Sequence, residues 1–406
     1  MTRNEMFSSR WAVVLVGLGM AVGTGNIWRF PRIVAENGGG AFLVAWLVFL
    51  FTWSIPLLIT EFAIGRKTRH GPIGAFAALN GPGSAWLGGF VVVTTVMIMF
   101  YYSVVTGWAL KYAIASGTGV FGEVDPEMFW SEYSKSFWQP SLFHIVSIGA
   151  AGMIVSRGIT NGIERASRIL IPLLFILLLC AVVRAVTLPG AVAGLSFLFV
   201  PDFSEFLNYR MWLEALTQSA WSTGAGWGLL LSYAIYVRKS EDVGGQAIRI
   251  GIGNNLASIL AAMAILPAAF AVLSPVEARS ALAAGNIGLT FVWIPRLFSA
   301  MPAGEFLLPV FFVALFSAAL SSLIAMVELA SRALIDRGIP RQRAVRLVVV
   351  LSSICGLPSA FSLAVFENQD WVWSLGLMIS GSFIALAAIR YGVQSFRVDL
   401  VNTQAG

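Results

Sequence analysis

The chain has 406 residues, of which 58% are hydrophobic and only 11% are charged, and its formal net charge is +6. A soluble chain carries about 25% charged residues, so this composition would expose too much apolar surface to water and indicates a protein that lies in a lipid bilayer. Cys180 and Cys355, the only cysteines, both lie in apolar runs, which excludes a disulfide scaffold and a cysteine-based metal site.

Ten stretches are apolar and long enough to cross a bilayer, which takes about 20 residues of helix. They are residues 11–34, 41–64, 86–115, 141–157, 166–187, 211–236, 245–273, 304–335, 342–362 and 371–396. Short polar links join most of them, and two longer excursions at about 116–140 and 274–303 are expected to carry short surface helices. The sequence therefore predicts an all-α integral membrane protein with one transmembrane domain over residues 1–406.

The basic residues predict how the chain is oriented. Lys and Arg accumulate on the cytoplasmic side of a membrane. With the N-terminus inside, most of the 26 Lys and Arg residues fall there, such as Arg66, Lys67 and Arg69, while acids such as Glu123 and Asp125 fall outside. Both termini are expected to be cytoplasmic, and the positive charge reflects this bias and not a nucleic-acid partner. The short loops and the lack of cysteines in outer loops indicate a prokaryotic inner membrane.

The first and sixth spans contain residues that a regular membrane helix disfavours. Several glycines and Asn26 lie within residues 17–31, and several glycines and Ser222 lie within residues 218–228. Irregular backbone at membrane depth is tolerated where it lines a cavity or is buried in protein. One such segment could simply let helices pack closely. Two such segments, each in the first span of a five-helix half, favour a transporter binding site.

The same residues carry a resemblance to a known family. The run from Gly23 to Pro31, Gly-Thr-Gly-Asn-Ile-Trp-Arg-Phe-Pro, followed by Glu-Asn-Gly-Gly-Gly-Ala-Phe at 36–42, resembles the first-helix signature of the neurotransmitter:sodium symporter family. Further matches occur at Pro56, Glu61, Tyr101-Tyr102, residues 201–203, Tyr236 and Ser321-Ser322. The resemblance covers essentially the whole chain.

The resemblance implies a LeuT-like fold, in which ten transmembrane helices form a 5+5 inverted repeat and helices 1 and 6 are unwound in mid-membrane. Residues 1–190 would form the first repeat, residues 200–398 the second, and residues 399–406 a short cytoplasmic tail. Most members have eleven or twelve spans, so this chain would lack the accessory helices that often lie at oligomer contacts. Its oligomeric state therefore stays open.

The resemblance also implies a sodium-coupled secondary active symporter with a substrate pocket between the broken helices. Backbone N–H groups of the first helix and the Tyr102 hydroxyl would hold a carboxylate, because free amides at the start of a half-helix favour an anion. Amine-transporting relatives carry an aspartate at the position of Gly23, so its absence favours a zwitterion such as a neutral amino acid. The implied pocket residues are Met20, Gly23, Thr24, Gly25, Ile98, Tyr102, Trp221, Gly224, Trp227, Ser322, Ala325 and Met326. Any one of the aromatics, taken alone, would be interpreted as core packing.

Two sodium sites are implied, because unwound helices offer backbone carbonyl oxygens to Na⁺. The first set is the carbonyl of Ala21, the amide oxygens of Asn26 and Asn254, and Ser222, completed by the substrate carboxylate. The second set is the carbonyls of Gly19, Val22 and Ala318 with the hydroxyls of Ser321 and Ser322. Taken alone, these serines would be expected to bond back to the preceding helical turn. The expected cofactors are one or two sodium ions and no organic cofactor.

A chloride site is a further hypothesis. Chloride-dependent relatives surround the anion with hydroxyl and amide donors, whereas chloride-independent ones place an acidic side chain there. Asn254 and Ser258 lie four residues apart on one helix face, and no carboxylate occupies that position. The candidate donors are Trp46, Gln218, Ser222, Asn254 and Ser258. Transport or sodium binding is therefore expected to respond to chloride.

Charged residues at membrane depth predict gates, because an unpaired charge there is costly. Outside, Arg29 is expected to pair with Asp370, with Tyr102 and Trp227 beneath them. Inside, Asp336 is expected to pair with an N-terminal arginine near Tyr236. Asn4 stands where the arginine is expected, and Arg3 is next to it.

Other classes of function fit less well. The sequence has no HExxH, GxSxG or P-loop motif, so no catalytic residue is assigned and an enzyme is not expected. A channel would need a ring of like residues from symmetric subunits. A membrane sensor or receptor with the same binding site but without coupled transport is the remaining alternative. The expected partners are a small-molecule substrate and the lipid bilayer.

Overall fold

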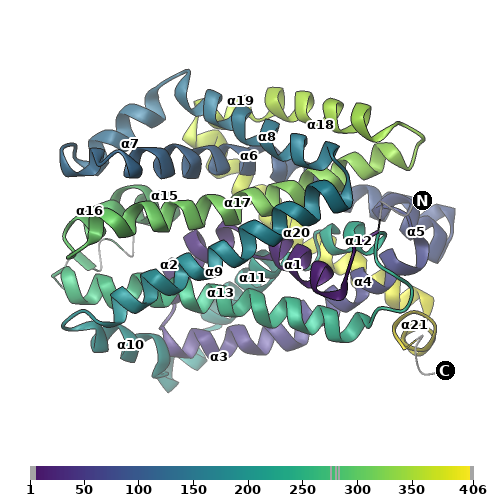
Figure 1. Ribbon diagram of the computed structural model, residues 1–406. Helices are drawn as coiled ribbons and strands as arrows, with labels where there is room; N and C mark the ends of the chain where they lie inside the picture. The colour runs from purple at the N-terminus through teal and green to yellow at the C-terminus, as the bar shows by residue number, and fades with distance from the viewer. Residues whose placement is uncertain (1–5, 275–276, 279–280, 282–283, 403–406) are drawn as a thin grey trace.

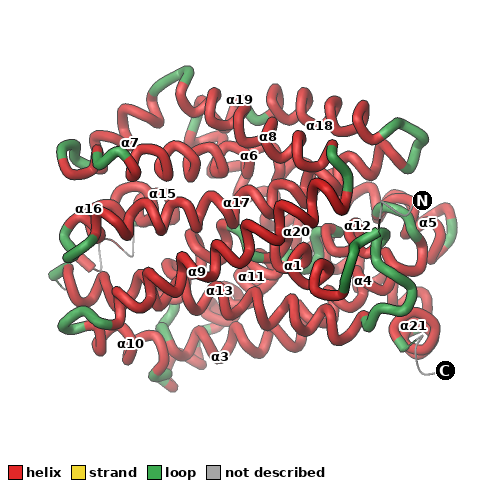
Figure 2. The backbone as a smooth tube through the Cα atoms, viewed as in Figure 1, coloured by secondary structure: helices red, strands yellow, loops and turns green. Residues whose placement is uncertain are grey.

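The computed structural model describes residues 6–274, 277–278, 281 and 284–402, and this part of the chain is almost entirely helical (Figures 1 and 2). Its helices are α1 (Arg10–Ala21), α2 (Phe30–Glu36), α3 (Gly40–Phe49), α4 (Ile55–Thr68), α5 (Pro72–Asn80), α6 (Ala85–Gly117), α7 (Pro126–Lys135), α8 (Gln139–Ser156), α9 (Arg165–Val186), α10 (Ala191–Phe199), α11 (Tyr209–Thr223), α12 (Leu229–Ala234), α13 (Val243–Val272), α15 (Gly285–Gly288), α16 (Ile294–Ser299), α17 (Gly304–Ile335), α18 (Arg341–Cys355), α19 (Leu357–Phe361), α20 (Leu363–Tyr391) and α21 (Val393–Phe396). Short π-helical turns continue several of them, such as Gly25–Arg29 before α2 and Leu50–Ser54 between α3 and α4.

Eight helical segments in the described residues are long and apolar enough to span a membrane. They are Gly40–Thr68, Pro82–Gly117, Gln139–Ser156, Ile159–Val186, Val243–Val272, Gly304–Ile335, Arg341–Phe361 and Leu363–Tyr391. A ninth is added if Arg10–Ala21 and Gly25–Glu36, which meet at a bend of 55°, count as one span. The predicted span 211–236 is divided into α11 and α12, so it does not appear as one long helix.

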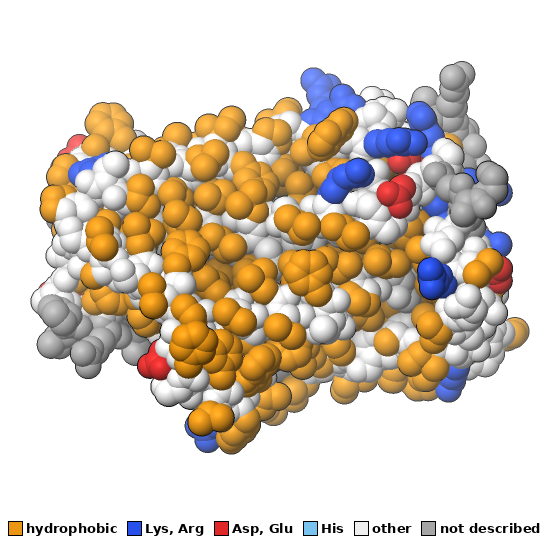
Figure 3. Space-filling model, turned by 90° about the horizontal axis from the view of Figure 1, so that it is seen from below, with side chains coloured by type: hydrophobic (Ala, Val, Ile, Leu, Met, Phe, Trp, Pro, Cys, Tyr) orange, Lys and Arg blue, Asp and Glu red, His pale blue; other side chains and the backbone are white. Residues whose placement is uncertain are grey.

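The surface agrees with a bilayer environment. The long helices lie side by side, and both termini lie at the same end of the molecule (Figure 1). Orange apolar side chains cover most of the face in Figure 3, whereas Lys and Arg gather mainly toward the end that carries the termini. Large side chains such as Phe51, Ile176 and Leu351 are more than half exposed. A soluble protein rarely exposes so much contiguous apolar surface, so the protein is an integral membrane protein.

The centre of the bundle is α17. In its most apolar stretch 83% of the residues are buried, compared with 33% in the span that ends with α9 and in α20. It packs against α6, α9, α18 and α8. Because α17 touches so many neighbours, its polar residues Ser321 and Ser322 are held in the interior.

Three predictions about the links between spans were incomplete or wrong. Residues 188–210 and the link after the second span were expected to be simple, yet they form α10 and α5. The excursion 116–140 carries α7, as expected. The described residues of 284–303 carry α15 and α16, and residues such as Ser299 and Pro302 are exposed, as expected for a surface excursion. Phe291 and Ile294 of the same segment are almost fully buried, however, and Phe291 stacks on Trp130. Aromatic packing draws this segment into the bundle.

The backbone leaves helical geometry where the glycines were noted. α1 ends at Ala21, and Val22 is extended. α11 ends at Thr223, and Gly224, Gly226 and Gly228 follow with φ of +69°, +94° and +72°. This left-handed region is open to glycine and strained for other residues, so the sequence itself ends the helix there.

Candidate functional site

The two interruptions face each other and enclose a small cavity of about 20 Å³. Its lining residues are Met20, Ala21, Gly23, Gly25, Tyr102, Trp221, Gly224, Trp227, Leu229, Ser322 and Met326. All the predicted pocket residues except Thr24, Ile98 and Ala325 are in this set, and Ala21 and Leu229 are additions. A volume of about 10–15 Å³ holds one water molecule, so the cavity is nearly closed in this conformation.

The buried carboxylate of Glu61 binds the backbone at the interruption between α11 and α12. It is fully buried and accepts hydrogen bonds from the backbone N–H groups of Gly226 at 2.7 Å and Leu231 at 3.3 Å. These are amides that lose their helical partners at the break. Glu61 therefore satisfies backbone donors that would otherwise be unpaired in the membrane interior.

One end of the cavity is built around Gly23 and Tyr102. The Thr24 backbone N–H donates to the Tyr102 hydroxyl at 3.0 Å, and the hydroxyl keeps its own proton to donate elsewhere. A Cβ at position 23 would lie 2.7 Å from both the Tyr102 hydroxyl and Ser322 Oγ. The space beside Tyr102 therefore exists because residue 23 has no side chain.

The residues of the first predicted sodium site lie together and are fully buried. Asn26 Nδ2 donates to the Asn254 side-chain oxygen at 2.8 Å. The side-chain oxygen of Asn254 also lies 3.2 Å from the Ala21 carbonyl oxygen and 2.6 Å from the Ser222 carbonyl oxygen. With the amide turned over, its nitrogen would donate to both carbonyls. Two carbonyl oxygens and the Asn254 side-chain oxygen therefore converge, as suits a hard cation that takes oxygen ligands. The side-chain oxygen of Asn26, a predicted ligand, instead accepts from the Gly23 N–H at 2.9 Å, so Asn26 turns its nitrogen toward this cluster.

The residues of the second predicted site also lie together. Ser322 Oγ lies 3.4 Å from the Gly19 carbonyl oxygen, 3.1 Å from that of Met20 and 3.4 Å from that of Val22. One hydroxyl proton serves only one of them. The carbonyls of Gly19 and Met20 lie in the last turn of α1 and that of Val22 directly after it, where the helix no longer supplies N–H partners. The donor set therefore fits Na⁺, and the carbonyl of Met20 is an addition to the predicted ligands.

The two serines of α17 differ. Ser321 Oγ donates to the Ala318 carbonyl at 2.9 Å, which is the bond to the preceding helical turn expected of such a serine taken alone. Ser322 instead reaches across to α1. The fold thus brings Ser321 and Ser322 to the end of α1, although Ser321 has an intrahelical partner in the predicted ligand Ala318.

Two of the predicted chloride donors, Asn254 and Ser258, are in direct contact with Asn26. Ser258 Oγ accepts from Asn26 Nδ2 at 2.8 Å, and Asn254 Nδ2 donates to Ser222 Oγ at 3.4 Å. Gln218 Nε2 donates to the Gly25 carbonyl at 2.8 Å. The indole N–H of Trp46 is buried and has no partner in the described part of the chain. A buried donor without a partner is unfavourable unless something accepts from it.

A second cavity of about 160 Å³ lies next to the first and is lined in part by residues of α15. In Figure 1, α15 lies toward the end of the bundle away from the termini. Gly25, Tyr102 and Trp221 line both cavities. Arg29 and Asp370, the predicted outer pair, both line the larger one. These three shared residues therefore form the wall between the larger cavity, called the vestibule below, and the smaller inner pocket.

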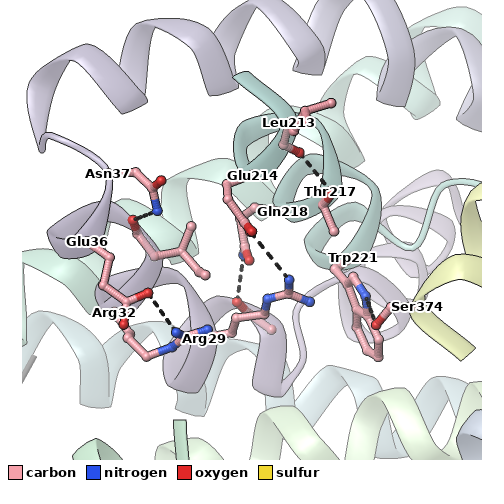
Figure 4. A network of polar contacts seen from close by, with 12 residues as sticks. Arg29, Arg32, Glu36, Asn37, Leu213, Glu214, Thr217, Gln218, Trp221 and Ser374 are labelled. Carbon is pink, nitrogen blue, oxygen red and sulfur yellow. Dashed lines mark hydrogen bonds and ion pairs between the residues drawn. The ribbon is translucent and has the colours of Figure 1, made fainter. Parts of the chain in front are cut away.

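The ion pair formed by Arg29 differs from the predicted one. Its guanidinium lies 3.9 Å from Glu214 and 5.6 Å from the centre of the Trp221 ring (Figure 4). The predicted partner Asp370 is not within ion-pair distance of it. The Trp221 indole N–H donates to Ser374 Oγ at 3.0 Å. Glu214 was not among the predicted residues.

At the opposite end, polar contacts are dense. The Tyr236 hydroxyl donates to Glu328 at 2.6 Å, and Arg341 lies 2.6 Å from Glu328 and 2.9 Å from the Tyr236 hydroxyl. Asp336 pairs with Arg332 at 2.6 Å and accepts from the Gly71 N–H at 2.6 Å. The predicted partner Arg3 lies outside the described residues. Neither Glu328 nor Arg341 was among the predicted gate residues.

The sequence profile of the Sodium:neurotransmitter symporter family matches residues 4–141 and 132–404. The chain belongs to this family. It is 36% identical over 405 residues to a sodium-dependent transporter of Methanocaldococcus jannaschii, covering 95% of this chain and 80% of that protein. A sodium-dependent transporter of Bacillus subtilis is 30% identical over 397 residues, covering 93% and 86%. A rat sodium-dependent neutral amino acid transporter is 29% identical, covering 66% of this chain and 40% of its own length.

Solved structures of the family agree with the fold. The crystal structure of MhsT in complex with L-phenylalanine superposes with a TM-score of 0.87 at 31% identity, covering 98% of this chain and 93% of that one. The chain therefore has the LeuT-like fold of the sodium:neurotransmitter symporters. These proteins are sodium-dependent transporters and not enzymes.

Proposed function

We propose that the protein is a symporter that couples inward sodium flow to the uptake of a small zwitterionic solute, a neutral amino acid or a close analogue, by alternating access. The observation that carries the proposal is the cavity at the two helix interruptions, with an oxygen cluster on each side. Tyr102 and Ser322 line it, and the carbonyl of Ala21 reaches the cluster around Asn26. A solute bound there would contact groups that also suit sodium, which is the physical basis of coupling.

The substrate class follows from the charges that the pocket offers. No acidic side chain lines the inner cavity, so a free ammonium ion would have no counter-ion. Tyr102 can donate to a carboxylate, and a carboxylate at this place can also ligate the first sodium ion. MhsT binds L-phenylalanine, and the rat relative carries neutral amino acids. Both relatives support an amino-acid-like zwitterion for this chain.

We assign two sodium ions to the two clusters. The first ion would be held by Ala21, Asn26, Ser222 and Asn254, and the second by Gly19, Val22, Ala318, Ser321 and Ser322. Chloride would bind among Trp46, Gln218, Ser222, Asn254 and Ser258, where the unpartnered Trp46 N–H supports an anion and a carboxylate is lacking. Bound chloride would favour sodium in the neighbouring first site, since an anion close to Na⁺ stabilises it.

The architecture we propose has ten spans. The bent pair of α1 and α2 is the first span, and α11 with α12 is the sixth. These two open the repeats 1–190 and 200–398, and residues 399–406 follow as a cytoplasmic tail. The gathering of Lys and Arg at the end with both termini supports a cytoplasmic location of that end (Figure 3). Relatives in an archaeon and a bacterium support a prokaryotic plasma membrane.

The different contacts at the two ends of the pocket support transport by alternating access. The vestibule lies on the side of Arg29 and Asp370, and the contacts among Tyr236, Glu328 and Arg341 close the other side. Closing the vestibule would bring Asp370 to Arg29 over Trp221. Opening the inner side would then require the buried contacts of Glu328 to separate or to move as a unit.

The test uses purified protein in detergent, with each proteinogenic amino acid and taurine, betaine and GABA, in sodium chloride and in choline chloride. A ligand that binds the folded state raises its thermal midpoint by mass action. A compound that stabilises only with sodium is then followed as uptake into liposomes under a sodium gradient. Uptake supports the symporter. Sodium-dependent binding without uptake would instead favour the sensor or receptor, and no stabilisation by any compound would overturn the pocket assignment.

A further inference from the structure

A third cavity, of about 190 Å³, lies away from the transport site, near the end of the bundle that carries the termini. It is formed where α1 packs against α13. Its lining residues are Arg10, Trp11, Val14, Gln246 and Arg249. Neither the sodium clusters nor the gates use any of them.

Two arginines, Arg10 and Arg249, line this cavity. Arg10 is 72% exposed and pairs at 3.3 Å with the buried Glu241. Arg249 is exposed and has no ion pair or hydrogen bond among the residues that the structure describes. Two arginines with only one acidic partner leave a net positive charge at the mouth of the cavity. This charge is complementary to an anion such as a phosphate.

Gln246 adds a hydrogen-bond acceptor. It is the most buried residue of the lining, with 1% exposure. Its Nε2 donates to Glu241 at 3.4 Å, and its side-chain oxygen is buried without a partner in the described part of the chain. A buried amide oxygen without a donor is unfavourable, so a ligand that brings a hydroxyl or ammonium donor to it would be favoured.

The surroundings of the cavity are those of a membrane boundary. Trp11 is 72% exposed, and Ile248 and Ile252 on α13 are 41% and 49% exposed. Exposed tryptophan is typical of the membrane interface, and exposed isoleucines face the lipid chains. A ligand in the cavity would therefore have its polar part at Arg10 and Arg249 and an apolar part along the helix surface.

We infer that this cavity is a binding site for a phospholipid whose headgroup carries a hydrogen-bond donor beside its phosphate. The phosphate would lie between Arg10 and Arg249, and a headgroup hydroxyl would reach the oxygen of Gln246. Because Arg10 lies on α1 and Arg249 on α13, the lipid bridges the first half of the interrupted helix to the rest of the bundle. The inference does not depend on the proposed substrate or on coupling.

The experiment is native mass spectrometry of the delipidated, detergent-purified protein titrated with phosphatidylglycerol, which has headgroup hydroxyls, and with phosphatidylcholine, whose quaternary ammonium has no donor. Wild-type protein is expected to bind phosphatidylglycerol more tightly. R249Q is expected to lose about tenfold or more of that affinity, as for a charge-assisted hydrogen bond. The matched control R343Q removes an exposed arginine of α18 that is outside the cavity and is expected to change the affinity less than about twofold.

Three outcomes would overturn the inference. Equal losses in R249Q and R343Q would mean that lipid binding follows overall charge. Equal affinity for the two lipids, unchanged by R249Q, would mean ordinary annular lipid. Competition by inorganic phosphate alone at the concentration of the lipid would mean a free-anion site. Because Arg249 is exposed, an unchanged gel-filtration profile and thermal midpoint without lipid would confirm that R249Q is folded.

Discussion

The two ends of the transport path are held in different ways. At the vestibule, Arg29 lies 3.9 Å from Glu214, which is 44% exposed, and a cavity of about 160 Å³ separates the helices. At the other end, the fully buried Glu328 is held by Arg341 and Tyr236, both at 2.6 Å. A loose exposed pair contributes little, whereas breaking a buried pair is costly. Opening the end at Glu328 is therefore expected to cost more free energy than moving Arg29 away from Glu214.

The largest effect is expected from breaking the inner contact. R341Q leaves the Glu328 carboxylate buried without its cation, which costs about 3–5 kcal/mol when one partner of a buried pair is removed. We expect a lower thermal midpoint in detergent and strongly reduced uptake. The double variant E328Q/R341Q replaces the lone charge with a neutral amide and should regain part of the stability.

The proposed role of the Glu328–Arg341 contact in holding the inner end closed can be refuted directly. If R341Q and R343Q, which removes an exposed arginine of the same helix, had equal thermal midpoints and equal uptake, the buried contact would not hold the inner end closed. A double variant no more stable than R341Q would show that the loss came from something other than the unpaired carboxylate.

The next effect concerns the pocket between the two ends. In G23A the new Cβ would lie 2.7 Å from the Tyr102 hydroxyl and from Ser322 Oγ, closer than carbon and oxygen tolerate. In the matched variant G25A the nearest atom lies at 3.7 Å, an ordinary contact. We expect G23A to weaken sodium-dependent substrate binding by about tenfold or more and G25A to weaken it much less. Equilibrium binding in sodium chloride measures both, and equal losses would contradict the assigned position of the carboxylate.

Much of this pocket could be predicted because its residues come from contiguous motifs. Gly23, Tyr102 and Ser322 lie in runs that resemble a family, so their meeting followed from the fold that the resemblance implies. Glycines in a membrane span also signal an irregular backbone by themselves. The site atoms that the sequence did not predict, such as the carbonyl oxygen of Met20, belong to the backbone, whose position no side-chain pattern reveals.

The gates could not be predicted as well, because charged partners far apart in sequence are matched by packing. Arg29 was assigned to Asp370, yet Glu214 is the acid within 3.9 Å. A buried acid such as Glu328 signals that a partner exists. Which arginine serves it depends on how α17 and α18 meet, and a single sequence does not specify that. The short helices α5 and α10 were missed because they are too short to span a membrane.

A third prediction separates the two acids of the vestibule. If Asp370 closes over Arg29 during transport, D370N should lower uptake by about tenfold while sodium-dependent binding changes less than about threefold. E214Q removes a long, partly exposed contact worth at most about 1 kcal/mol, so both uptake and binding should change less than about fivefold. Parallel uptake and binding assays on the two variants measure this. A larger loss in E214Q than in D370N would assign the outer gate to Glu214.

The smallest expected effect lies on the outer surface, where Arg296 of α16 joins Asp125 and Glu127 at the start of α7. Hydrogen bonds from Arg296 lower the pKa of Asp125 below its ordinary value of 3.8. A lowered carboxyl pKa means that the contact stabilises the folded state at neutral pH, and that this contribution is lost as the pH falls through the lowered pKa. The thermal midpoint of wild type should therefore exceed that of R296Q slightly at pH 7, and the difference should vanish in strong acid. A difference that persisted there would show that Arg296 acts through packing on Trp293, over whose ring it lies at 5.5 Å, and not through its charge.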